Sequence, residues 1–343
     1  MSFSQIIGQE EAKSLLINAI KTEKTSHAYI FSGPKGSGKM MLAEAFAQML
    51  LCENPGDDAC GQCHSCHQSI SRNNPDIIYV SPEEGKASLS VDIVREQINN
   101  NIVIKPYSGK YKVYIVDEAE KMNQQAQNAL LKTIEEPPAY AIIILLTTNH
   151  NSFLQTILSR CVTIQMKTIS DEAIKSHLTQ KFQIVDYQSE IVASFAQGNL
   201  GKAIELATSA DFQEIKEKTL SLVKRVGAMD EYEISQAVGE IKDLRDRDKK
   251  GEGNLSQPFV GQILDLITLW YRDVLLYKAT ADDSLLIYKE DSYDIKQLAD
   301  TCTYHGLNEI FDTIDHTRKR LSANVNFELT IMLLIVGLKE NSK

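Results

Sequence analysis

The residues best suited to chemistry lie in a short glycine-rich segment near the start of the chain. It reads Gly33-Pro34-Lys35-Gly36-Ser37-Gly38-Lys39 and matches the G-x-x-x-x-G-K pattern of a phosphate-binding loop. Glycines at these positions let backbone N–H groups turn toward an anion at a helix N-terminus, where the helix dipole also favours negative charge. Lys39 would reach the terminal phosphates of ATP or ADP.

The residue after this lysine departs from the pattern. A phosphate-binding loop normally continues with Ser or Thr, whose hydroxyl binds Mg²⁺, but this chain has Met40. A thioether sulfur is a poor ligand for a hard cation that prefers oxygen. We therefore expect a loop built like a nucleotide site that does not hydrolyse ATP unaided. The sequence leaves open whether a nucleotide still binds.

A pair of carboxylates follows a predicted buried strand farther along the chain. Asp117 and Glu118 end the apolar run Val113-Tyr114-Ile115-Val116. In P-loop NTPases an Asp at this place orients Mg²⁺ and a Glu polarises the attacking water. Acidic residues are also common at solvated strand ends. The pair favours descent from a nucleotide site, whether or not either carboxylate is still catalytic.

Two further polar features could belong to such a site. Thr147-Thr148-Asn149 ends another predicted strand and could sense phosphate, or could be a polar strand end that leads into a turn. Arg160, in Ser159-Arg160-Cys161, could reach the γ-phosphate bound to a neighbouring subunit and stabilise transition-state charge in trans. An isolated arginine there is more often a surface residue or part of a local salt bridge.

Four cysteines form a second candidate site. They are spaced C-x7-C-x2-C-x2-C and comprise Cys52, Cys60, Cys63 and Cys66. Four thiolates can hold Zn²⁺ in a closed tetrahedral site that fixes a small segment lacking its own core. Disulfides and free thiols are the alternatives. The N-terminus lacks the pattern of a signal peptide, so we expect a cytoplasmic protein, in which disulfides are rare. His64 or His67 could replace one cysteine, but the all-cysteine set fits better.

Composition limits the class of protein. The chain has 343 residues, of which 43% are apolar and 24% charged, as in ordinary soluble proteins of two or three domains. No apolar run approaches the roughly 18 residues of a membrane span, so we expect no membrane association. The net charge of −10 argues against a broad DNA-binding surface, and so against a stand-alone zinc-dependent nucleic-acid-binding protein. Protein partners are the better expectation.

Strand and helix signals alternate over the first half of the chain. Apolar runs predict strands at Tyr29–Ser32, Asp76–Val80, Lys112–Val116, Ala141–Leu146 and Val162–Met166. Helices are predicted between them, including Met41–Leu51, Asp92–Asn101 and Gln124–Glu136, the last of which Pro137-Pro138 would stop. Strands that alternate with helices indicate an α/β fold with a parallel sheet covered on both faces.

After residue 166 the strand signals stop and helix signals take over. We expect short helices at 171–179, 189–196 and 202–207, long ones at 259–278 and 324–339, and a charged surface loop at 243–258. The chain thus divides into an α/β nucleotide-binding module at 1–166 with a zinc insertion at 52–74, a small helical lid at 167–210, and an all-α C-terminal domain at 211–343.

An ordered series of segments identifies a family resemblance. The segments are His27–Gly33, the four-cysteine insertion, Val116–Ala119, Asn128–Pro138, Thr147–Asn149 and Ile157–Cys161. This series resembles the AAA+ subunits of the bacterial DNA polymerase III clamp loader, strongly over residues 5–166 and more loosely beyond. The resemblance implies a RecA-like AAA+ module, structural zinc and a helical collar domain. It also implies a hetero-oligomer with motor (gamma/tau) and delta subunits that loads the sliding clamp onto primed DNA.

Two departures distinguish the types of subunit within this family. A motor subunit resembles this chain but has a hydroxyl residue where Met40 stands, and an arginine in the lid where we place Gly201. Both departures favour the delta-prime type, a stator with no turnover of its own that belongs to a DNA-directed DNA polymerase (nucleotidyltransferase) holoenzyme. The alternative within the family is an ATP-hydrolysing gamma/tau motor.

The resemblance also bears on Arg160 and on the C-terminal helices. The family's Ser-Arg-Cys motif sends its arginine into the ATP site of the adjacent motor subunit, which makes Arg160 a trans arginine finger. The C-terminal helices would join a pentameric collar, with apolar faces that could include Ile263, Leu264, Ile267 and Trp270. Those four residues are more simply explained as internal core.

Overall fold

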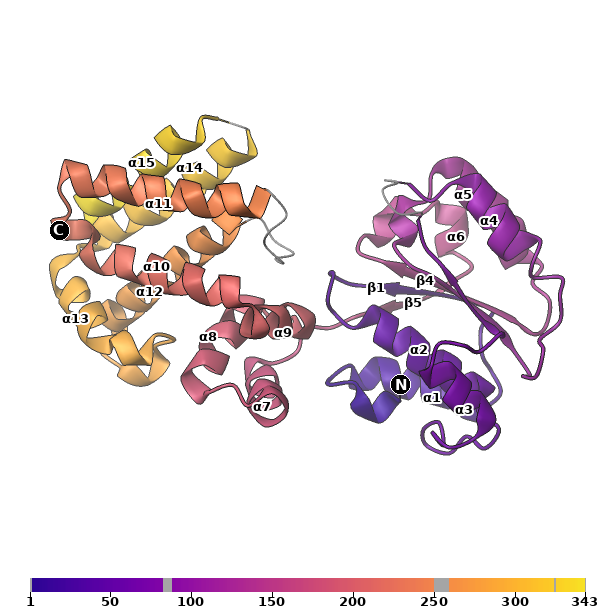
Figure 1. Ribbon diagram of the computed structural model, residues 1–343. Coiled ribbons are helices and arrows are strands. Elements are labelled where there is room, and N and C mark those ends of the chain that lie inside the picture. Colours follow the sequence, from indigo (N-terminus) through magenta and orange to yellow (C-terminus); the bar gives the residue numbers. More distant parts are fainter. Residues whose placement is uncertain (1, 83–87, 250–258, 324, 343) are drawn as a thin grey trace. The chain divides into compact units, whose positions relative to one another are not determined.

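The computed structural model describes residues 2–82, 88–249, 259–323 and 325–342, and the chain divides into two compact units (Figure 1). The first unit contains the chain up to Ala173 together with Asn199–Gly201. The second contains Ile174–Gly198 and the chain from Lys202 onward. The predicted division into three domains at residues 166 and 210 stays a prediction.

The first unit is built on a parallel five-stranded sheet with the strand order β2-β3-β4-β1-β5. The strands are β1 (Ala28–Ser32), β2 (Ile77–Val80), β3 (Lys112–Val116), β4 (Ala141–Thr147) and β5 (Val162–Gln165). They confirm the predicted α/β class and all five predicted strands. Ser32 pairs with Thr147, and Val116 pairs with Leu145. The carboxyl ends of β1, β3 and β4 therefore meet at one edge of the sheet.

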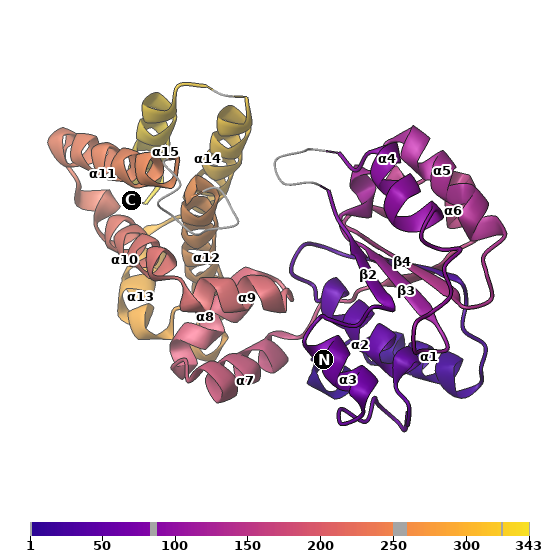
Figure 2. The ribbon, with the colours of Figure 1, turned by 45° about the vertical axis from the view of Figure 1, so that its right-hand side comes forward.

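Helices cover both faces of this sheet (Figures 1 and 2). One face carries α1 (Glu10–Lys21) and α2 (Lys39–Leu51), and the other carries α4 (Val91–Val94), α5 (Gln124–Glu135) and α6 (Gln155–Leu158). Strand β4 is apolar at successive positions because side chains alternate between the faces. Ile142, Ile144 and Leu146 pack with α1 and α2, whereas Ile143 and Leu145 pack with α4, α5 and α6.

Short elements complete this unit. They are α3 (His64–Ile70), the 3-10 helices η1 (Phe3–Gln5), η3 (Ala119–Lys121) and η4 (His150–Ser152), and the π-helical segment η2 (Arg95–Asn99) that continues α4. The helix predicted over Asp92–Asn101 is thus α-helical only in its first turn. Helix α3 lies inside the predicted four-cysteine insertion.

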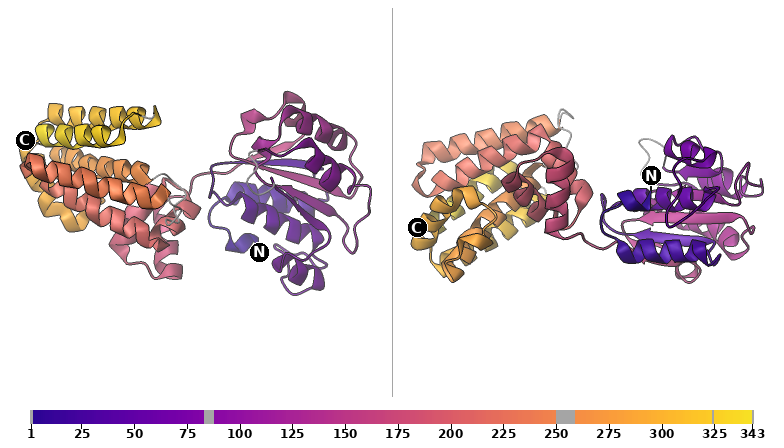
Figure 3. Two further views of the ribbon diagram at one scale, coloured as in Figure 1. Left: turned by 45° about the horizontal axis from the view of Figure 1, so that its top comes forward. Right: turned by 90° about the horizontal axis from the view of Figure 1, so that it is seen from below.

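The described part of the second unit is entirely helical, as predicted (Figure 3). Its helices are α7 (from Asp171 in the first unit to Phe182), α8 (Asp186–Ala196), α9 (Leu200–Thr208, whose first two residues belong to the first unit), α10 (Ala210–Arg225), η5 (Val226–Ala228), α11 (Glu231–Lys249), α12 (Phe259–Thr280), η6 (Asp283–Leu285), η7 (Lys289–Asp291), α13 (Ser292–Thr301), α14 (Tyr304–Ser322) and α15 (Phe327–Asn341). None of the helices in the described chain has the length and apolarity that a membrane span requires.

Helix α12 forms the centre of this unit, with α10, α11, α13 and α14 packed around it. The four residues that could have faced a neighbour are all buried here: Ile263, Leu264, Ile267 and Trp270. Trp270 contacts Tyr288 with 5.6 Å between the ring centroids. These residues are internal core, as the simpler interpretation of the sequence held.

The surface loop predicted over 243–258 is wrong in its first half. Helix α11 continues through Lys249, while residues 250–258 lie outside the described chain. The stretch 243–249 contains no Gly or Pro, so nothing in it breaks the helical hydrogen-bond ladder. Leu244 is also buried and extends the apolar stripe of Ala237 and Ile241 at helical spacing. The many charged residues at 243–249 favoured a loop in the sequence prediction, although Leu244 among them is buried.

Candidate functional site

The predicted phosphate-binding loop joins β1 to α2, and its glycines are required by local geometry. Gly36 and Gly38 have φ angles of 82° and 89°, in the left-handed region that side chains disfavour. Gly33 is required for another reason. A Cβ atom built on Gly33 would lie 2.7 Å from the Cβ of Met166, which is closer than packing permits. The three glycines therefore allow the tight turn that a phosphate-binding loop requires.

A cavity of about 390 Å³ lies beside this loop at the carboxyl ends of β1, β3 and β4. Most of the sequence-predicted nucleotide residues meet there, namely Gly36, Gly38, Lys39, Met40, Asp117, Glu118, Thr147, Thr148 and Gly201. Parallel strands bring their carboxyl ends to one edge, and open α/β sheets bind ligands at that edge. The structure thus gathers residues that lie far apart in sequence.

Lys39 is held by its own loop. Its amine donates hydrogen bonds to the carbonyl oxygens of Gly33 at 2.7 Å and Pro34 at 2.8 Å. Burial lowers the pKa of Lys39, and the nearby charges of Glu120 and Asp117 oppose that shift. An ammonium group has three N–H donors, so one donor of Lys39 remains for a phosphate oxygen while both hydrogen bonds are kept.

The two predicted carboxylates line the cavity, and each has a partner in its own turn. Glu118 adopts a left-handed backbone conformation with φ 47° and ψ 42°, and its carboxylate pairs with Lys121 at 2.8 Å. Asp117 accepts a hydrogen bond from the N–H of Glu118 at 2.9 Å. The Glu118 carboxylate is therefore already paired with a lysine of the same turn.

Glu120 is a third carboxylate at the cavity, and the sequence interpretation missed it. Its carboxylate accepts a 2.6 Å hydrogen bond from the hydroxyl of Thr148. Burial alone would raise the pKa of Glu120, but hydrogen bonds from Thr148 and Thr147 outweigh burial and hold the pKa below its usual value. Glu120 therefore adds negative charge where nucleotide phosphates would lie. Its position two residues beyond Glu118 was the available signal.

Two more features of the cradle differ from a hydrolytic site. Met40 lines the cavity and packs against the apolar core, so no hydroxyl stands at the magnesium-binding position. Gly201 donates its N–H to the carbonyl of Gly36 at 3.1 Å, and a Cβ built on it would lie 2.5 Å from that oxygen. An arginine at position 201 would not fit in this arrangement. Asn199 adds a 2.6 Å hydrogen bond to the carbonyl of Lys35.

Arg160 lies apart from these residues, between α6 and β5. It precedes β5 by two residues, whereas the phosphate-binding loop begins after Ser32, which pairs with the last residue of β5. The four residues of β5 rise roughly 13 Å along the strand. Arg160 therefore lies at the amino end of β5, whereas the cavity lies at the carboxyl ends of the strands. It pairs with Glu135 at 3.1 Å, a partner the sequence gave no reason to expect.

The four predicted cysteines converge at a second site in the first unit. Their sulfur atoms all lie within 4.8 Å of one another, and those of Cys60 and Cys66 are 3.9 Å apart. Zn–S bonds of about 2.3 Å at tetrahedral angles would separate sulfurs by about 3.8 Å. The four residues could therefore hold one metal ion. His64 and His67 are exposed and belong to no such group among the described residues.

Local backbone structure supports thiolates at this cluster. Cys52 follows α2 directly, and its sulfur accepts the N–H of Cys60 at 3.3 Å. Cys63 caps α3 by accepting the N–H of Cys66 at 3.4 Å. N–H groups of Gln62 and Cys63 lower the pKa of Cys60 to about 6, whereas burial raises the pKa of Cys66 to about 12. A bound dication would offset the cost of ionising the buried thiol.

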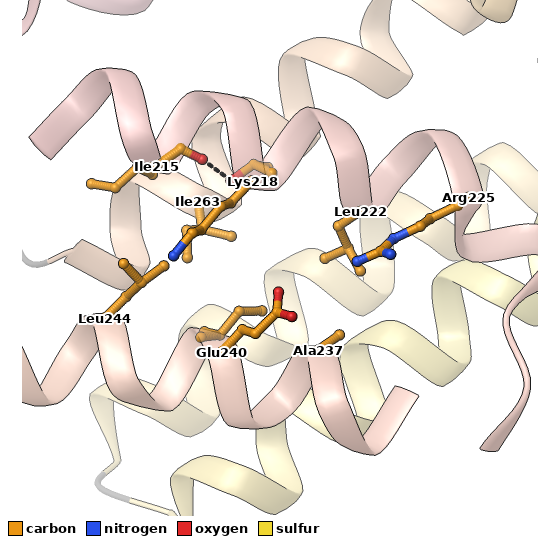
Figure 4. Close-up of a pocket in the computed structure, with 10 residues that line it drawn as sticks. Ile215, Lys218, Leu222, Arg225, Ala237, Glu240, Leu244 and Ile263 are labelled. Carbon is orange, nitrogen blue, oxygen red and sulfur yellow. Dashed lines mark hydrogen bonds between the residues drawn. The ribbon is translucent and has the colours of Figure 1, made fainter. Parts of the chain in front are cut away.

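The second unit has a pocket between α10 and α11, lined by residues that include Lys218, Arg225 and Glu240 (Figure 4). Its volume is about 20 Å³, which has room for about one water molecule. This pocket is too small for a nucleotide, so the cavity beside Lys39 is the better candidate.

Comparisons with known proteins agree along most of the chain. Residues 8–170 match the family model described as DNA polymerase III, delta subunit, and residues 254–340 match the model for its C terminal. The tau subunit of DNA polymerase III from Bacillus subtilis is 29% identical over 339 residues, covering 93% of this chain and 58% of tau. The delta' subunit of the same bacterium is 29% identical over 335 residues, covering 97% of this chain and 96% of delta'.

The chain thus spans little more than half of the length of tau but nearly all of delta'. Among solved structures, a DNA polymerase III gamma subunit-related protein from Thermotoga maritima is 18% identical with a TM-score of 0.48. The match covers 96% of this chain and 99% of that one. At that score the structural likeness carries no argument of its own.

Proposed function

Because the chain belongs to the DNA polymerase III delta-subunit family and is a clamp-loader subunit of the delta-prime type, we propose that it completes a neighbouring subunit's ATP site without hydrolysing ATP itself. In this role it assembles with motor (gamma/tau) and delta subunits and helps to load the sliding clamp onto primed DNA. As part of the polymerase holoenzyme it acts through its partners. Its own nucleotide cradle is vestigial.

The position of Arg160 is the observation that carries this proposal. The side chain lies at the edge of the sheet opposite to its own nucleotide cavity, so a phosphate that it contacts belongs to another subunit. Its side chain is 42% exposed and is therefore accessible to a partner. An arginine supplied in trans stabilises the charge that develops during phosphoryl transfer.

The cavity beside Lys39 supports the proposal that this chain does not hydrolyse ATP itself. Met40 supplies no oxygen for Mg²⁺, the amine of Lys39 is bonded to its own loop, and Glu120 adds negative charge at the cavity. Phosphoryl transfer depends on positioned cations to offset phosphate charge. A cavity that lacks the hydroxyl that normally binds Mg²⁺ at position 40 and gains a carboxylate is poorly suited to that chemistry.

We expect the isolated chain to show no ATP turnover above background, and Lys39→Ala to leave that result unchanged. Phosphate release and nucleotide binding by calorimetry would be measured on the purified chain, with Lys24→Ala as a matched control at an exposed lysine of the same unit that does not line the cavity. Turnover that Lys39→Ala abolishes would contradict the proposal.

The ATP-hydrolysing motor remains the second candidate because specific observations favour it. The loop retains Gly33, Gly36, Gly38 and Lys39 with the expected geometry, and the match to tau covers nearly the whole chain. A motor needs magnesium at its nucleotide. The same assay decides between the two candidates, since magnesium-dependent turnover by the lone chain is expected only of a motor.

The proposed collar surface lies on α15 rather than on α12. Exposed apolar side chains form a stripe at helical spacing on α15: Leu329, Met332 and Leu333 are 52%, 39% and 42% exposed. This helix lies within the region that matches the C-terminal family model. We propose that the stripe packs against the helical domain of a neighbouring loader subunit.

Charges placed on this stripe are expected to weaken assembly. The double substitution Leu329→Glu and Leu333→Glu should lower association with the motor subunits by at least about tenfold, because an unpaired charge is costly to bury. Tyr293→Glu is the matched control, since Tyr293 is 70% exposed on α13 and lies outside the stripe. Gel filtration with purified partners would measure the effect. Equal assembly by both variants would rule out this surface.

A further inference from the structure

We propose that Glu135 is a positioning residue for Arg160, one that holds the guanidinium at the edge of the sheet in readiness for a neighbour's phosphate. The inference rests on the proposed trans role of Arg160 and goes beyond it. It assigns to a carboxylate on another helix the task of ordering the arginine before the subunits meet.

Three acceptors from two helices hold the guanidinium. Nη2 of Arg160 lies 3.1 Å from Oε1 of Glu135, in the last turn of α5. Nη1 donates to the carbonyl oxygen of Thr156 at 3.1 Å and to the hydroxyl of Ser159 at 3.2 Å. Both terminal nitrogens are therefore fixed, one by α5 and the other by the segment that carries Arg160.

The contact brings together segments that are otherwise separate in the chain. Pro137 and Pro138 follow α5 and prevent it from continuing, so Glu135 stays at the helix end. Helices α5 and α6 pack against each other, and this brings Glu135 to Arg160. The C-terminal end of a helix also favours a nearby cation. Helix dipole and carboxylate therefore act in the same direction on the guanidinium.

Folding stability does not explain this pair. The side chains of Arg160 and Glu135 are 42% and 41% exposed, and ion pairs this exposed contribute little to stability. The pair instead limits the conformations that the arginine side chain can adopt. Such a long side chain loses much rotamer entropy when it is ordered. A guanidinium has five N–H donors, so donors remain for phosphate oxygens after these three contacts. An arginine ordered in advance loses less freedom when it binds the transition state.

The test uses the clamp loader reconstituted from purified subunits, with substitutions only in this chain. The turnover that Arg160→Ala removes defines the Arg160-dependent part. Glu135→Ala should lower kcat for that part by about tenfold, since misplacing a catalytic group by about 1 Å can cost roughly 10²-fold. KM for ATP should stay the same, because the finger acts in the transition state. Glu135→Gln retains an acceptor oxygen and should lose less.

Two comparisons separate positioning from a structural role. Glu136→Ala removes the neighbouring exposed carboxylate, for which the described residues show no ion pair, and should have no effect. In a chain that already carries Arg160→Ala, Glu135→Ala should have no further effect, because a positioning residue acts only through Arg160. A further loss in that background would show that Glu135 supports the fold or another contact, and would overturn the inference.

The remaining outcomes are also decisive. If Arg160→Ala lowers turnover while Glu135→Ala leaves it unchanged or raises it, the positioning role is wrong and the trans role stands. A rise would mean that the carboxylate competes with phosphate for the guanidinium. If Arg160→Ala itself has no effect, the trans role is wrong and the positioning role fails with it.

Discussion

Replacing Arg160 with alanine is expected to reduce ATP turnover at the motor site that we propose this chain completes by about 10³-fold or more, the range seen for arginines supplied in trans. The reason is electrostatic, because the guanidinium offsets charge on the transferring phosphoryl group. The ATP turnover of the whole clamp loader should fall by the fraction that this one site contributes. ATPase assays on the reconstituted complex, with and without clamp and primed DNA, would measure the loss.

The substitution should leave the chain folded, which makes the kinetic result interpretable. Arg160 is 42% exposed, and its pair with Glu135 is worth only about 0–1 kcal/mol to stability at such exposure. Arg95→Ala is a matched control, because Arg95 is 61% exposed in the same unit and pairs only loosely with Asp92 at 3.9 Å. Equal turnover with Arg160→Ala and with Arg95→Ala would refute the trans role.

The sheet could be predicted from sequence because its strands are buried on both faces. β4 reads as an unbroken apolar run, and such a run between helices has few explanations other than a central parallel strand. The motifs around Lys39 and Asp117 predict one nucleotide site, and the two residues meet at one cavity because parallel strands end at the same side of the sheet. Candidate site residues at the ends of parallel strands can therefore be predicted from the sequence.

Other contacts at the site could not be predicted, because they depend on how distant segments pack together and no local sequence pattern indicates that packing. Glu135 meets Arg160 only because α5 and α6 lie side by side, and nothing in either segment indicates the partner. Gly201 fits against Gly36 only because its backbone approaches the loop, which spacing along the chain does not show. Glu120 differs from both, because its place two residues beyond Glu118 in the sequence is enough to suggest a third acid at the same strand end.

Removal of the proposed zinc ion is expected to have the second large effect, on the segment between α2 and β2. We propose that Cys52, Cys60, Cys63 and Cys66 hold one Zn²⁺, and metal analysis should return about one Zn per chain. Apparent zinc-binding energies in small domains reach about 10–16 kcal/mol, so this segment should lose its structure when zinc is chelated. Hydrogen exchange over residues 52–74 would measure that loss.

The effect should stay local because the sheet has a core that does not depend on the cysteines. Leu42, Phe46 and Met49 of α2 are buried against that sheet, so the first unit should keep most of its far-UV signal after chelation. Cys63→Ser should abolish stoichiometric zinc, whereas Cys161→Ala and His64→Ala should retain it, since neither residue belongs to the cluster. A fully protected segment in metal-free protein would exclude a structural metal. Loss of zinc with His64→Ala would place an imidazole among the ligands and replace the four-cysteine set.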